Sequence, residues 1–84
     1  MTIDEILSLK KSDIKKMTFK DILSMLEMIS YTFQHNNDLD VEYALEIYKK
    51  SLDLLIIARE KLILAKEEKE KIDKAFEEIK KNFD

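Results

Sequence analysis

The feature that most constrains this chain is a stretch from residue 40 to residue 83 in which mostly apolar residues recur at alternating steps of three and four. We call this repeat the seam. Its members are Val41, Ala44, Tyr48, Ser51, Leu55, Ala58, Leu62, Ala65, Lys69, Ile72, Phe76, Ile79 and Phe83. The stretch contains no glycine or proline, and a 3.5-residue period held this long predicts a coiled-coil helix. At 1.5 Å per residue, the helix would be roughly 65 Å long.

The composition limits the classes of protein to consider. A chain of 84 residues allows one small domain, and the absence of cysteine excludes a disulfide framework, a thiolate metal site and a cysteine nucleophile. The net charge of −3 disfavours unaided nucleic-acid binding, which usually needs a basic excess. The N-terminal stretch does not have the pattern of a signal peptide, and no apolar run is long enough to span a membrane. We therefore expect a soluble, cytoplasmic, all-α protein without a cofactor.

A second helix is predicted over residues 18–35. Thr18 has N-cap chemistry, and Asp21 lies three positions later, where a carboxylate favours the helix start. The apolar stripe of this helix consists of Phe19, Ile22, Leu23, Leu26, Ile29 and Phe33, widened by Met17, Met25 and Met28. Methionine at helical spacing indicates adaptable core packing rather than a ligand site.

The segment 35–38 is predicted to be the turn between the two helices. Because no glycine is available, Asn36 or Asn37 is the expected left-handed residue that ends the helix over 18–35. Asp40 is then expected to cap the long helix. A turn this short predicts an antiparallel helical hairpin.

Residues with possible chemistry are few. Asp38, Asp40 and Glu42 could be seen as a cation loop, but the glycine and the distant glutamate of a calcium loop are missing, which favours helix capping. His35 is the only histidine, and it lacks the partners that catalysis would need. No catalytic, cofactor or metal residue is predicted.

Residues 1–16 are predicted to be a short N-terminal helix over 2–11 with a basic connector, preceding a helical-hairpin domain at 17–84. Thr2 and Glu5 have capping-box spacing. The basic residues of this region are Lys10, Lys11, Lys15, Lys16 and Lys20. They indicate either a solvated connector or a patch that meets an acidic partner or DNA held by another subunit.

The two hairpin helices differ greatly in length. The helix over 18–35, roughly 27 Å long, covers less than half of the long helix, and residues 2–11 could fold down and cover part of what remains. Solubility of the far end is expected from Glu–Lys pairs at i,i+4, namely Glu67–Lys71, Glu70–Lys74 and Glu77–Lys81. The apolar residues left as candidate partner contacts are Leu55, Ile56, Leu62, Ile63, Ile72, Phe76, Ile79 and Phe83. Since exposed apolar surface marks an interface, we expect assembly into a helical bundle, as a homo-oligomer or with another helical protein.

Several segments, taken in order, resemble the small subunit of exodeoxyribonuclease VII. They are T-F-K-D-I-L at 18–23, L-E-M-I at 26–29, L-D-V-E-Y-A-L at 39–45, Y-K-K-S at 48–51, and the spacing of Leu54, Ala58, Leu62 and Ala65. The resemblance covers about residues 18–69. It departs from the family at the turn, where His35–Asn37 replaces Ser-Gly, and at Ser51 and Lys66, where the family has Gly and Glu.

The resemblance implies a non-catalytic subunit of a bacterial nuclease that degrades single-stranded DNA to oligonucleotides. The large subunit would supply the nuclease site and a DNA-binding domain, and several small subunits would coat its long helical arm. The alternative, from another class, is a self-associating coiled-coil scaffold or adaptor unrelated to nuclease activity. An enzyme in its own right is disfavoured because no nucleophile, base or metal cluster is present.

Overall fold

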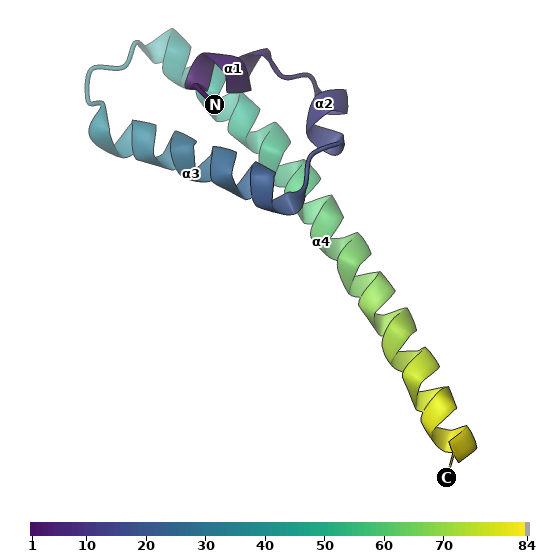
Figure 1. The fold of residues 1–84 in the computed structure, drawn as a ribbon. Helices are drawn as coiled ribbons and strands as arrows, with labels where there is room; N and C mark the ends of the chain where they lie inside the picture. Colours follow the sequence, from purple (N-terminus) through teal and green to yellow (C-terminus); the bar gives the residue numbers. More distant parts are fainter. Residues whose placement is uncertain (84) are drawn as a thin grey trace.

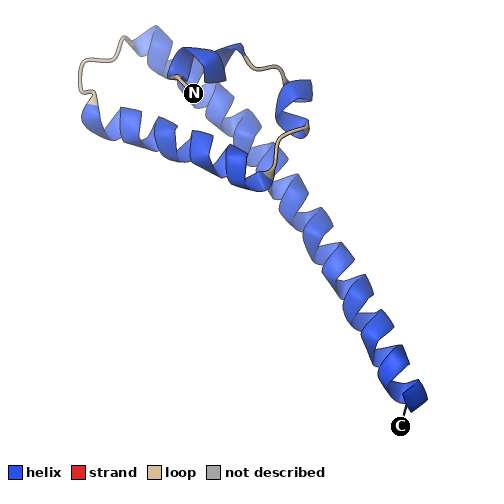
Figure 2. Cartoon of the chain, viewed as in Figure 1, coloured by secondary structure: helices blue, strands red, loops and turns tan. Residues whose placement is uncertain are grey.

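The computed structural model describes residues 1–83, and these residues form four helices and no strand (Figure 2). The helices are α1 (Ile3–Ser8), α2 (Lys11–Lys15), α3 (Phe19–His35) and α4 (Val41–Phe83). Helix α3 lies along the first half of α4, α1 and α2 lie beside the same half, and the second half of α4 projects alone to the C-terminal end (Figure 1). The all-α class and the long helix are confirmed.

Side-chain caps fix where the first helices begin. The Thr2 hydroxyl accepts the Glu5 amide at 3.2 Å while the Glu5 carboxylate accepts the Thr2 amide at 3.4 Å, so the predicted capping box is present. The Thr18 hydroxyl accepts the Asp21 amide at 3.1 Å, as predicted. The expected connector contains a helix of its own, α2, whose Asp13 carboxylate accepts the Lys10 amide at 3.0 Å.

The turn between α3 and α4 differs from the prediction. Asn36 ends α3 with φ −124° and ψ 96°, an extended conformation, and its amide donates to the Thr32 carbonyl at 3.1 Å. No described residue has positive φ, so the prediction of a left-handed residue at Asn36 or Asn37 was wrong. The connection over 36–40 is long enough to reverse the chain without one. At Asp40 the backbone carbonyl accepts the Ala44 amide at 2.9 Å.

Among the residues whose burial is described, the hydrophobic core lies within residues 1–61, which we call the body. Its buried members are Ile6, Ile14, Ile22, Met25, Ile29, Ile47, Leu54, Ile57 and Ala58. All four helices contribute, and no polar residue is buried among the described ones. From Leu62 to Asn82 every residue is exposed. We call residues 62–83 the tail.

The molecule is far more extended than a compact chain of this length. Its radius of gyration is 18.5 Å, against about 12 Å for a compact domain of this length. Its longest dimension, 65 Å, matches the length expected for α4 alone. The accessible surface is 7008 Å², which is roughly 1,800 Å² more than a compact monomer of 10.0 kDa exposes. None of residues 62–82 is buried, so the tail adds accessible surface without adding to the core.

Candidate docking surface

The face of α4 that packs into the body differs from the seam. Ile47, Leu54 and Ile57 are buried, and none of them belongs to the seam. Ala58 is the seam residue that reaches the core, whereas Tyr48 remains exposed. The body therefore uses a neighbouring face of α4 and leaves much of the seam on the surface.

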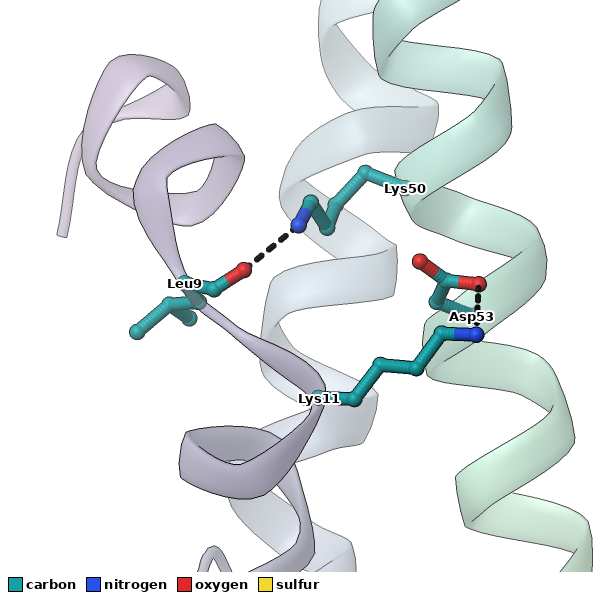
Figure 3. A network of polar contacts seen from close by, with 4 residues as sticks. All are labelled: Leu9, Lys11, Lys50 and Asp53. Atoms are coloured by element: carbon teal, nitrogen blue, oxygen red, sulfur yellow. Dashed lines mark hydrogen bonds and ion pairs between the residues drawn. The ribbon is translucent and has the colours of Figure 1, made fainter.

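Contacts from the N-terminal helices explain the choice of face. The Lys50 ammonium donates to the carbonyl of Leu9, the C-cap of α1, at 2.5 Å (Figure 3). The Lys61 ammonium donates to the carbonyl of Lys15, the last residue of α2, at 2.8 Å. A lysine at a helix C-terminus satisfies a free carbonyl and opposes the negative end of the helix dipole. These two lysines thus hold α1 and α2 against one flank of α4.

Two further contacts complete this flank. The Tyr43 hydroxyl donates to the Asp4 carboxylate at 2.8 Å, and this hydrogen bond, with some desolvation, raises the pKa of Tyr43 above its usual value. The Lys11 ammonium lies 3.9 Å from the Asp53 carboxylate (Figure 3). Part of the predicted basic cluster is therefore engaged within the chain.

The opposite flank carries an apolar groove between α3 and α4, with a volume of about 230 Å³. It is lined by Phe19, Leu23, Leu26, Leu55, Ala58, Arg59 and Leu62. Leu55 and Leu62, both predicted contacts, are 51% and 53% exposed. The predicted contacts Ile56 and Ile63 are also exposed, one position beyond these leucines along α4.

The α3 wall of the groove was not among the predicted contact residues. Leu23 and Leu26 were assigned to a single stripe facing α4, yet Leu23 is exposed and Leu26 is half-buried. The width of that stripe could have indicated a second contact surface on α3. Its nine residues spread over more of the helix circumference than one partner helix covers.

The tail presents a narrower apolar surface. Ile72, Phe76 and Ile79 are 54%, 66% and 52% exposed, and we call these three residues the tail stripe. The side chain of Phe83, the last predicted contact, lies outside the described part of the structure. In the described tail, the i,i+4 ion pair is Lys69–Asp73, 3.8 Å apart. The three predicted Glu–Lys pairs of this region do not reach ion-pair distance.

Few of the described side chains are arranged in a way that could bind a metal ion or take part in catalysis. No three histidine or carboxylate side chains converge there in a way that could hold a metal ion, and this includes the loop of Asp38, Asp40 and Glu42. The His35 ring stacks on the Tyr31 ring with centroids 4.0 Å apart, and its Nδ1 lies 2.9 Å from the Tyr31 carbonyl. Local packing thus accounts for the position of His35. Among the described helices, none has the length and apolarity needed to cross a membrane.

The groove and the tail stripe are the surfaces that stand out. No protein-family model, curated protein or solved structure matches this chain. What the surfaces can do therefore follows from their own chemistry. Both are apolar and lie along helices, which suits the binding of other helices rather than catalysis.

Proposed function

We propose that this chain is a non-catalytic helical-hairpin subunit that docks onto the extended helical arm of an exonuclease large subunit, which degrades single-stranded DNA. One observation carries the docking role: an apolar groove runs between α3 and α4, and the predicted contacts Leu55 and Leu62 line it while half of each side chain is exposed. The nature of the partner rests on the sequence resemblance over about residues 18–69.

The groove has the character of a helix-binding site. One wall is α3, with Leu23 and Leu26, and the other is α4, with Leu55 and Leu62. An apolar helix laid between them would remove side chains of both walls from water, as in other helix-in-groove complexes. Arg59 at the rim could pair with an acidic residue of that helix.

The function of such a subunit is assembly and positioning. Full burial of a leucine or isoleucine contributes about 1.5–3 kcal/mol, so covering the exposed part of several of them would stabilise a long solvent-exposed arm. Several copies along one arm would form a helical bundle around it. The catalytic residues would belong to the large subunit.

Co-expression with a tagged exonuclease large subunit tests the proposal. We expect this chain to co-purify and to increase the loss of single-stranded DNA by the large subunit, while the chain alone degrades nothing with or without Mg²⁺. The double variant Leu55→Asp/Leu62→Asp should lose most of the co-purification. The control is Leu64→Asp, because Leu64 is exposed on the same helix but lies outside the groove.

The test also separates the alternative function. Absence of a complex, with circular dichroism showing that the chain is folded, would contradict the nuclease role. If the same protein then sediments as a multimer, the self-associating scaffold becomes the better description. The surplus of exposed apolar surface favours that second candidate equally well.

A further inference from the structure

The tail stripe faces a different direction from the groove. Eighteen residues make five turns of an α-helix, so Ile72 lies in line with Leu54 and Phe76 lies in line with Ala58. Leu54 and Ala58 are buried in the body. The tail stripe therefore continues the buried face of α4. Its edge at Phe76 borders the side of the groove, because Ala58 also lines the groove, whereas Leu55 and Leu62 open into it.

The space in front of the tail stripe has a defined length. Helix α3 begins at Phe19, which lies level with Leu62 in the groove, and α2 is held at Lys61. Beyond these points, none of the other three described helices lies beside α4 (Figure 1). The open space runs along residues 62–83, roughly 33 Å, and accepts one helix of about that length.

We infer that this space is occupied by the tail of a second copy, packed antiparallel about a two-fold axis near residues 72 and 73. The antiparallel direction follows from the body. A parallel second helix would lie in line with α3 and would run into it near Phe19. An antiparallel tail ends where α3 begins, and its own body lies beyond the C-terminal end of the first copy.

The two-fold arrangement pairs the seam of one tail with the seam of the other. The tail of each copy has the length of the space that the other offers. Ile72 lies near its own equivalent, whereas Phe76 lies level with about Lys69 of the other copy and Ile79 with about Ala65, so that residue i contacts residue j and j contacts i as in an isologous interface. The surface supports this occupant. Each chain exposes roughly 1,800 Å² more than a compact monomer, whereas a standard interface removes about 800 Å² from each partner. A tail interface of standard size would thus remove less than half of this surplus surface.

This interface does not depend on the proposed nuclease role, because it uses the tail and leaves the groove free. Since the chain has no cysteine, single-cysteine variants report contacts between copies directly. Ala75 and Asn82 lie seven residues apart, on the same flank of the helix. In the antiparallel pair, the two copies of residue 75 are roughly 8 Å apart along the axis, and those of residue 82 roughly 28 Å.

A short bismaleimide should therefore cross-link Ala75→Cys into a covalent dimer and leave Asn82→Cys monomeric. Cross-linking of both variants would show a parallel pair, and cross-linking of neither would show that the tails do not meet. Either result overturns the inference. Adding Phe76→Asp to Ala75→Cys should reduce the cross-linked fraction at least fivefold, with the helical circular dichroism of the body retained. Adding Leu55→Asp, which changes the groove outside the tail, should leave the cross-link intact, whatever the outcome with the exonuclease large subunit.

Discussion

At the scale of single residues, two isoleucines and two lysines hold the N-terminal segment on α4. Helices of six and five residues, such as α1 and α2, are too short to be stable in water. Ile6 and Ile14 are 0% exposed and anchor them in the core, while Lys50 and Lys61 bind their terminal carbonyls. The cap residues Thr2 and Thr18 could be predicted from the sequence, because capping is local. The burial of Ile14 could not be predicted, because a single apolar residue within K-K-S-D-I-K-K forms no periodic apolar pattern.

Ile14→Ala should lower the free energy of unfolding by about 2–4 kcal/mol, because it leaves a cavity in a packed core. Urea denaturation followed by circular dichroism measures this change. The matched control is Ile63→Ala, the same substitution at an exposed position, which should cost about 0.5 kcal/mol or less. Equal losses for the two variants would mean that the N-terminal segment does not form part of the core.

At the scale of elements, α4 consists of a packed half and an unpacked half. Its existence and length follow from the sequence, since no helix breaker interrupts the repeat. Which face of α4 packs into the body does not follow from the sequence, because two heptad repeats of residues, the seam and a second set, are interleaved along the helix. The second set also steps by four and three and consists of Tyr43, Ile47, Lys50, Leu54, Ile57 and Lys61. The position of α1 and α2 decides between the sets, and no local pattern places a short helix against a distant one.

Hydrogen exchange should distinguish the two halves of α4. At low concentration, amides of residues 45–61 should be protected more strongly than those of residues 66–80, because a lone helix has few tertiary contacts to resist local opening. Raising the protein concentration should increase protection in the tail and change the body little. Uniform protection of α4 at all concentrations would contradict the division into body and tail.

At the scale of the whole molecule, the chain has one end with a core and one end without. The hydrophobic groups of the tail cannot be reached by the body, because α1, α2 and α3 all lie beside residues 41–61 (Figure 1). The sequence predicts this imbalance from helix lengths alone. It could not predict that the groove and the tail stripe face different directions, since that depends on which face of α4 the body covers.

The central claim is that helices from outside the chain must cover α4, and small-angle X-ray scattering of the purified chain tests it most directly. We predict a particle mass at least twice the 10.0 kDa of one chain at high protein concentration, with a long, rod-like shape. A particle of 10.0 kDa with a radius of gyration near 12 Å would contradict the account. It would mean that the tail folds back and is covered by its own body.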